Sequence, residues 1–226
     1  RFGPFSLSDL VRLCGPFALS RLSPKRNIAE TSVFYHRFQI FNVRGDAMYA
    51  ATIDQGATAW VLISIALVAF MTPGLAFFYG GMVRAKNVLG MLMQNIFAMG
   101  LISVIWATVG FSLAFGGTGK YIGNFDFALM KDLATIESLP GYTGDFALVI
   151  PVLAFFAFQM MFAVITPALI TGATADRLKF SAYAILIGVW AVVVYPAVAR
   201  WVFSPNGWLF QRGALDFAGG AVVHIN

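Results

Sequence analysis

Apolar residues in this chain run in long stretches that are separated by short charged segments. Four intervals contain no charged side chain, and they lie between Asp54 and Arg84, Lys86 and Lys120, Asp145 and Asp176, and Lys179 and Arg200. Each interval holds an apolar run of about 20 residues or more, enough for a helix to cross a hydrocarbon layer about 30 Å thick. The pattern predicts membrane-spanning helices at roughly 57–80, 90–115, 146–171 and 180–199, and the start of a fifth near Asp216.

The predicted fold class is all-α, a polytopic transmembrane helical bundle. Its apolar runs are continuous and contain Gly and Pro, as transmembrane helices do. A membrane β-barrel would instead show alternating segments of about ten residues. Helix-interior prolines at Pro73, Pro167 and Pro196 predict kinks, which are tolerated where neighbouring groups satisfy the freed carbonyls.

Composition supports an integral membrane protein. Hydrophobic residues make up 59% of the chain and charged residues 11%, whereas soluble domains average about 45–50% and 25%. The net charge of +5 comes mainly from residues 1–47, which carry seven Arg/Lys and three acidic residues. This distribution does not predict a nucleic-acid surface. Cys14 is the only cysteine, so no intramolecular disulfide can form.

Residues 1–47 form a leader that differs from the rest of the chain, and residues 48–226 form the predicted membrane domain. The leader lacks the apolar region and cleavage site of a secretory signal. Its arginines and serines resemble an organellar targeting peptide, but it contains acids and has no amphipathic period. The alternative is that translation naturally starts at Met48 and that the preceding residues are upstream sequence.

Charge in the short loops predicts the orientation of the helices. Arg84 and Lys86 follow the first span, and Arg177 and Lys179 follow the third, whereas the loop at 116–145 holds four acids and two lysines. Basic loops face the cytoplasm. The expected topology therefore has the 81–89 and 172–179 loops inside and the N-terminus outside.

His224 and Asp216 are the ionisable residues of the last apolar segment, and such residues within a membrane are functional candidates. On a continuous helix they would lie about 12 Å apart along the axis and roughly 80° apart around it. A packed, hydrogen-bonded histidine is the alternative for His224. Asp216 precedes the apolar run, where it is expected to cap the helix by accepting backbone N–H groups. Gly219 and Gly220 allow close approach.

Phe155, Phe158 and Phe162 follow spacings of three and four residues, which predicts an aromatic stripe on one face of the third span. Packing or lipid contact is the ordinary role of such a stripe. Gln159 lies beside it and needs a hydrogen-bond partner inside the bilayer. Elsewhere the sequence has no phosphate-binding Gly-Lys-Ser loop, no metal-spaced histidine pair and no CxxC. We therefore expect neither an enzyme nor a metal or other cofactor.

Three stretches carry a resemblance to the ammonium transporter family, the Amt/Mep/Rh group. They are FMTPGLAFFYGGMVRAKNVLGML at 70–92, FQMMFAVITPALITGATADRLKFSA at 158–182 and GALDFAGGAVVHIN at 213–226. The resemblance implies a homotrimer with one narrow pore in each subunit. It also implies an eleven-helix fold of two inverted five-helix halves. The chain looks like the first half, truncated at the start of the fifth helix.

The resemblance assigns pathway roles to four residues. His224 matches the first of two neighbouring pore histidines. The second has no counterpart here, since His36 lies in the leader. Phe162 matches the outer aromatic gate, with Phe158 and Gln159 alongside it.

Two further positions follow from the same resemblance. Asp216 matches a structural acid beneath the vestibule that recruits ammonium. The position of the family's cation-recruiting tryptophan falls on Phe203, with Trp201 and Trp208 close by. Phenylalanine offers a weaker cation–π face than tryptophan. Either recruitment is weaker in this chain or a neighbouring tryptophan substitutes.

The implied function is transport of ammonium or ammonia across the cell membrane, with methylammonium as a surrogate. Ammonium would bind at the outer aromatic site, lose its proton as it is desolvated, and pass the histidine as neutral ammonia. An ammonium sensor is one alternative, and a fragment that cannot transport by itself is another. A cytoplasmic regulatory protein is a possible partner through a region beyond Asn226.

Overall fold

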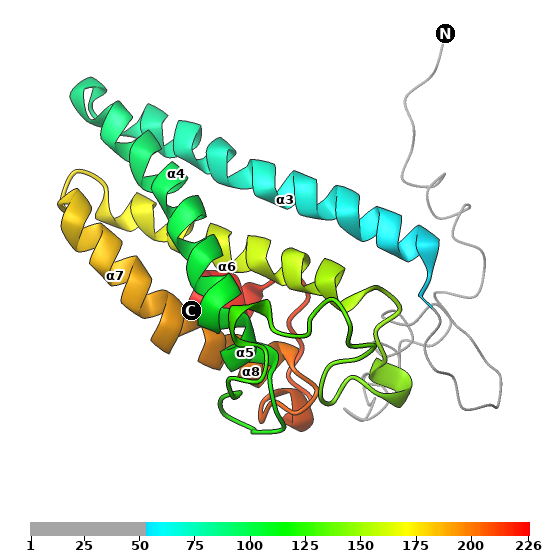
Figure 1. Ribbon diagram of the computed structural model, residues 1–226. Coiled ribbons are helices and arrows are strands. Elements are labelled where there is room, and N and C mark those ends of the chain that lie inside the picture. The colour runs from blue at the N-terminus through cyan, green and yellow to red at the C-terminus, as the bar shows by residue number, and fades with distance from the viewer. Residues whose placement is uncertain (1–52) are drawn as a thin grey trace, which may run out of the picture. The chain divides into compact units, whose positions relative to one another are not determined.

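The computed structural model describes residues 53–226, which form an all-helical bundle (Figure 1). Strands are absent from these residues. The predicted fold class, a polytopic helical membrane bundle, is confirmed. The leader at 1–47, with Cys14 and His36, lies outside the described residues.

Four helical stretches are long and apolar enough to cross a membrane, as the sequence predicts. They are Gln55–Met82, Ala85–Phe115, Val152–Thr174 and Phe180–Phe203. The first is α3 (Gln55–Met82) and the third is α6 (Val152–Thr174). The second comprises η1 (Ala85–Asn87), α4 (Val88–Ile105), the π-helical η2 (Trp106–Gly110) and α5 (Phe111–Phe115). The fourth comprises α7 (Phe180–Val193) and α8 (Tyr195–Phe203).

Short helical segments lie between the second and third stretches and after the fourth. Within the described residues they are η3 (Ala128–Met130), η4 (Gly144–Phe146), η5 (Phe210–Arg212) and η6 (Gly220–Ile225). The third span was expected from about residue 146 but begins at Val152. Pro151 stands directly before that helix, and the residue that precedes a proline is disfavoured in the helical region.

The first span is anchored at its start by a side-chain cap. Asp54 is extended, and its carboxylate accepts a hydrogen bond from the Ala57 backbone N–H at 2.6 Å. The Asp54 backbone N–H in turn donates to the carbonyl of Val149 at 2.8 Å. Ala57 would otherwise lack a partner in the first turn. The start of α3 is thereby tied to the chain that enters α6.

Helix α3 runs alongside α6 and also packs on α4, while α4 contacts α6 and α7 (Figure 1). Gly172 of α6 lets the Tyr79 ring of α3 pack against it, since a Cβ atom there would lie 2.7 Å from that ring. The other face of α3 carries exposed apolar side chains, among them Trp60, Leu67 and Phe70. Such a face suits hydrocarbon rather than water.

An aromatic cluster fills the core where α5, α6 and α8 meet. Trp106 is 1% exposed and makes edge contacts with Phe111 at 5.8 Å and Tyr195 at 5.8 Å. Phe115 packs edge-on against Phe155 at 5.1 Å. The indole Nε1 of Trp106 donates to the carbonyl of Phe156 at 3.4 Å. Edge-to-face pairs of this kind add to the free energy gained by burial.

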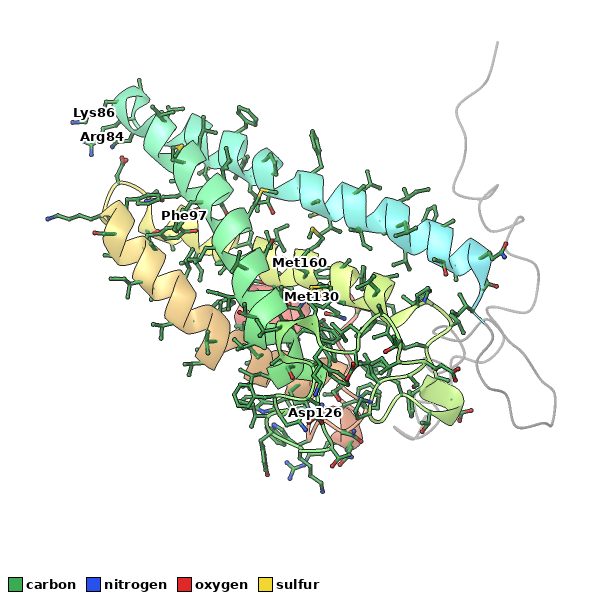
Figure 2. All side chains as sticks on the ribbon, viewed as in Figure 1. Arg84, Lys86, Phe97, Asp126, Met130 and Met160 are labelled. Atoms are coloured by element: carbon green, nitrogen blue, oxygen red, sulfur yellow. The ribbon has the colours of Figure 1, made fainter. Side chains whose placement is uncertain are left out.

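The two ends of the bundle differ in charge. Figure 2 shows Arg84 and Lys86 where α3 turns into α4, and Asp126 at the opposite end. At the basic end, Arg84 Nε lies 3.3 Å from Asp176 Oδ2, and the Asn87 side chain donates to the same carboxylate. Asp176 therefore joins the loop after α3 to the loop after α6.

A proline explains the interruption of the fourth span. Pro73 and Pro167 lie within α3 and α6. Pro196 lies instead at the start of α8, so the fourth span is divided at Val194 into α7 and α8. A proline lacks the N–H that would continue the helix and clashes with the preceding turn.

Arg200, on α8, is fully buried. Its guanidinium donates to three backbone carbonyls at the end of α5 and in the loop after it: Gly119 at 2.7 Å, Gly117 at 2.9 Å and Ala114 at 3.4 Å. The last carbonyls of a helix have no partner within the helix. A planar guanidinium with five donors can satisfy several of them at once. Arg200 therefore fastens α8 to α5.

Replacing Arg200 with methionine is expected to lower the free energy of unfolding by about 2 kcal/mol, because the buried carbonyl of Ala114 and the two part-buried bonds to Gly117 and Gly119 lose their donor. For a chain of this size that corresponds to a fall in melting temperature of about 4–8 °C. Thermal unfolding in detergent, followed by size-exclusion recovery, measures it. Arg177→Met is the matched control, because Arg177 is exposed. Equal melting temperatures for the two variants would contradict the role given to Arg200.

Candidate functional site

The aromatic stripe predicted on the third span is divided between two environments. Phe158 and Phe162 are partly buried and form an edge-on pair with ring centroids 5.0 Å apart. Phe155 is 8% exposed and packs against Phe115 and Tyr142 in the aromatic core. The three rings share one face of α6, as their spacing predicts, but Phe155 is covered by the loop and the helix that pack over the start of α6.

Gln159 lies between the paired rings in sequence and is 6% exposed. Its Oε1 atom is buried and accepts no hydrogen bond from the described residues. Buried polar atoms are nearly always hydrogen-bonded, so exceptions mark positions of interest. Thr72 Oγ1, on α3, is a second buried atom in this condition. Both atoms can therefore take part in a further hydrogen bond within a mainly apolar bundle.

Asp216 caps the last helical segment, η6, as the sequence predicts. One carboxylate oxygen accepts from the Gly220 N–H at 2.7 Å, and the other accepts from Ala221 at 3.0 Å and Val222 at 2.9 Å. Both oxygens are therefore held by N–H groups that the segment itself leaves unpaired.

Helical structure at this end begins at Gly220 rather than near Asp216. Gly219, directly before it, has a left-handed φ of 80°, which glycine adopts without steric cost. The spacing of about 12 Å and 80° expected for Asp216 and His224 assumed one continuous helix. That expectation is wrong, because the chain turns at Gly219 between the two residues.

His224 lies on η6, which packs against α6 and α8. Its backbone N–H donates to the Gly219 carbonyl at 3.0 Å, and its side chain is exposed. Within the described residues the imidazole forms no hydrogen bond or ring contact with the other predicted site residues. The packed-histidine alternative therefore has no support from residues 53–226.

Phe203 ends α8 and is partly buried against the core. Its carbonyl accepts a hydrogen bond from the Tyr142 hydroxyl at 3.1 Å. Burial raises the pKa of the Tyr142 phenol, so the hydroxyl stays protonated and remains a donor. This bond fixes the end of α8 against the loop that leads into α6, which is where Phe155 also packs.

Trp201 and Trp208 lie near Phe203 in the sequence, and their rings are 5.9 Å apart in an edge-on arrangement. Trp201 Nε1 donates to the Tyr121 carbonyl at 2.7 Å. The guanidinium carbon of Arg212 lies 5.0 Å from the centre of the Trp208 ring. Trp208 therefore already has a cation, the Arg212 guanidinium, over its ring. This bears on the alternative that a neighbouring tryptophan substitutes for Phe203 as the cation site.

Sequence reasoning missed Arg200 and Arg212. The sequence did contain a signal for Arg200, because this residue is the charge that ends an uncharged interval of 20 residues. Arg212 had none, because its partner Trp208 could not be distinguished from the other aromatic residues. Among residues 53–226 no group of three or more His, Cys, Asp or Glu side chains could hold a metal ion.

Comparison with known proteins places this arrangement in one family. Residues 59–226 match the Ammonium Transporter Family. The ammonium transporter of Mycobacterium tuberculosis (strain H37Rv) is 48% identical over 191 residues, a match that covers 76% of this chain and 40% of that protein. The ammonium transporter of Aquifex aeolicus is 45% identical over 179 residues, covering 78% and 40%. The chain spans about 40% of the length of these curated relatives.

Solved structures show the same likeness. The G343C mutant of Candida albicans Mep2 superposes with a TM-score of 0.69 at 30% identity, covering 76% of this chain and 37% of that one. Saccharomyces cerevisiae Mep2 gives a TM-score of 0.68 at 30% identity with the same coverage. A structure titled Sensor Amt Protein gives 0.63 at 29%, covering 74% and 40%. Because the family match extends over most of its length, this chain belongs to the ammonium transporter family.

Proposed function

We propose that this chain supplies the first half of a pathway that carries ammonium, as ammonia, across the cell membrane. The observation that carries the proposal is the match of residues 59–226 to the ammonium transporter family. It is supported by four apolar spans and by a paired aromatic face at Phe158 and Phe162. Homologues are named as transporters, in agreement with a function other than catalysis.

Recruitment begins at the end of the bundle where α8 terminates. A cation there meets the aromatic face of Phe203, and then the Phe158–Phe162 pair on α6. A bare ammonium ion is costly to move into an apolar passage. As its water is removed, ammonium therefore transfers its proton to the relay that begins at the His224 imidazole, and neutral ammonia continues. Gln159 Oε1, buried without a donor among residues 53–226, can accept a hydrogen bond from the passing N–H groups.

His224 acts beyond the aromatic pair. An imidazole has one nitrogen that donates and one that accepts, so it can hold ammonia and relay a proton. Its segment is oriented by Asp216, whose carboxylate holds the first three N–H groups of η6. Asp216 also adds negative charge on the recruiting side. The exposed imidazole edge is available to a second half of the fold and to a second pore histidine.

The assembled transporter is proposed to be a homotrimer in the cell membrane, with a cytoplasmic regulatory protein as a partner. Sensing remains the second candidate function, since one similar structure is titled Sensor Amt Protein. Transport is preferred because the relatives reported above are named ammonium transporters. An inactive fragment is the third alternative, and the uptake experiment below tests it directly.

The proposed topology has an outside N-terminus and inside loops at 81–89 and 172–179. It predicts glycosylation of an acceptor site inserted in the 116–145 loop and no glycosylation of one inserted after Asp176, because loops rich in Arg and Lys stay in the cytoplasm. Gel mobility with and without a deglycosylating enzyme measures both. Glycosylation only at the second site would mean that the topology is the opposite of the one proposed.

The transport proposal is tested by methylammonium uptake in cells that lack their own ammonium transporters. The chain is fused to the part of the Mycobacterium tuberculosis relative that lies beyond the aligned region. The fusion is expected to take up methylammonium, and Phe162→Ala is expected to alter the uptake rate, because the proposed gate loses an aromatic ring. Phe77→Ala removes an equally large side chain from an exposed site on α3 and is expected to leave uptake unchanged.

Expressed alone at the same level, the 226-residue chain tests the inactive-fragment alternative. Uptake by the fusion but not by the chain alone would assign activity to the pair of halves. Equal uptake by Phe162→Ala and Phe77→Ala would indicate that Phe162 serves in packing and not as a gate. Phe155→Ala is unsuitable as a control, because Phe155 belongs to the aromatic core and truncating it costs about 3–5 kcal/mol of stability.

His224→Ala in the same fusion is expected to abolish ammonium-driven current while the protein still assembles. The current is expected to be lost because the proposed proton relay is removed. Assembly is expected to persist because the side chain is exposed on η6 and supports no packing within residues 53–226. Size-exclusion chromatography measures assembly, and current and uptake are recorded on the same preparation. An assembled variant with unchanged current would remove the proton relay from the mechanism.

A further inference from the structure

One threonine hydroxyl in the membrane spans differs from the others. The four spans contain six threonines, and five of them donate to a backbone carbonyl three or four residues earlier: Thr58, Thr108, Thr166, Thr171 and Thr174. This is the ordinary bond of a threonine in a helix. The sixth, Thr72 on α3, is 1% exposed, and its Oγ1 atom has no hydrogen-bond partner among residues 53–226. A buried hydroxyl without a partner costs free energy, so this atom marks a position where a ligand can bind.

Thr72 faces the interior of the bundle. It is one of three buried residues of α3, with Ala76 and Gly80, and these follow one another at intervals of four residues. Helix α3 packs on α4 and α6, and a Cβ atom at Gly80 would lie 3.6 Å from the Val88 side chain of α4. Charged side chains are absent from α3, α4 and α6. The Thr72 hydroxyl therefore needs a small neutral partner that fits inside a junction of three helices.

Helices α3 and α6 run side by side in the same direction (Figure 1). At their start the Asp54 N–H donates to the Val149 carbonyl, a separation of 95 positions in the sequence. Near their ends the Tyr79 ring packs on Gly172, a separation of 93 positions. Each residue of α3 therefore lies level with a residue of α6 that follows it by about 94 positions.

Both helices contain a Thr-Pro step, and the two steps, Thr72–Pro73 and Thr166–Pro167, are 94 positions apart. They therefore lie at the same level. Pro73 has no N–H to donate to the Ala69 carbonyl, and Pro167 has none for the Ala163 carbonyl. Carbonyls of an α-helix point toward its C-terminus, so both of these oxygens are directed toward the level of Thr72. Three polar groups that lack the ordinary helical partner thus share one level of an apolar bundle.

A water molecule has the hydrogen-bonding groups that this set requires, because it can donate twice and also accept. We propose that one water molecule is bound between α3 and α6, where it accepts from the Thr72 hydroxyl and donates to the carbonyls of Ala69 and Ala163. Ordered water satisfies carbonyls that proline frees in a membrane span, and about three partners is typical of a buried water. Buried side chains within one turn of this level include the small Ala76, Ala163 and Ala168, which make room for it.

The bound water supports the helix pair at its middle. Asp54 joins the start of α3 to the chain that enters α6, and Asp176 joins the loops that follow the two helices. The water adds a connection between these points, one turn from Phe162. It is independent of the proposed function, since it is tested without any measurement of transport.

The water is tested by NMR of the 226-residue chain in deuterated lipid nanodiscs, with carbon-13 threonine methyl groups in a deuterated protein. Thr72→Ser keeps the hydroxyl but removes the methyl group, and thereby assigns the Thr72 signal. Magnetisation transfer from water is expected at the Thr72 methyl group and not at those of Thr166 and Thr171, which are equally buried. A Thr72 signal without such transfer, like those of Thr166 and Thr171, would overturn the proposal.

Thr72→Val provides a second test, in which the sign of the effect is decisive. Valine has the shape of threonine without the hydroxyl. Because the water loses its donor, the substitution is expected to lower the melting temperature in detergent by about 2–4 °C. A hydroxyl that truly lacks a partner predicts the opposite, since valine then removes an unpaired buried polar atom. An unchanged or higher melting temperature would therefore also contradict the proposal.

Thr166→Val is the matched control. It removes an equally buried hydroxyl whose bond is to the Phe162 carbonyl of its own helix, and it is expected to change the melting temperature by less than about 1 °C. The NMR measurement uses the unchanged chain, so it decides the question even if the valine variant of Thr72 does not fold.

Discussion

A carbonyl at the end of a helix needs a donor, and inside an apolar bundle water is scarce. Arg200 meets this requirement for the end of α5 and the loop that follows, through three carbonyls. Helix α8 cannot shift along α5 without breaking these bonds. The positions of Trp201 and Phe203 follow, since both lie within one turn of Arg200. The geometry at the end of α8 therefore depends on one buried guanidinium.

The parts of the fold that depend on local pattern could be predicted from the sequence. Uncharged intervals of sufficient length give the four spans, because burying charge in hydrocarbon is costly. Asp216 could be identified as a cap, because a carboxylate that precedes an apolar run has unpaired N–H groups within reach. The interruption at Pro196 follows equally from one residue and its neighbours.

The parts that depend on distant partners could not be predicted. Arg200 contacts residues more than 80 positions earlier in the chain, and spacing does not reveal such pairs. Periodicity places Phe155, Phe158 and Phe162 on one face of a helix but does not say what covers it. The loop residue Tyr142 and the α5 residue Phe115 cover Phe155 and leave the other two rings as a separate pair.

Asp216 also shapes the electric field around the start of η6. Its carboxylate is directed into three N–H groups, and the partial positive charge at the start of a helix opposes the negative charge of an acid placed there. The electric field around Asp216 is therefore weaker than the field of a bare carboxylate. A cation approaching from water is drawn in more weakly than by a bare carboxylate, and is correspondingly easier to release inward. A residue that anchors a helix thereby also limits how deep the electrostatic well beside it can be.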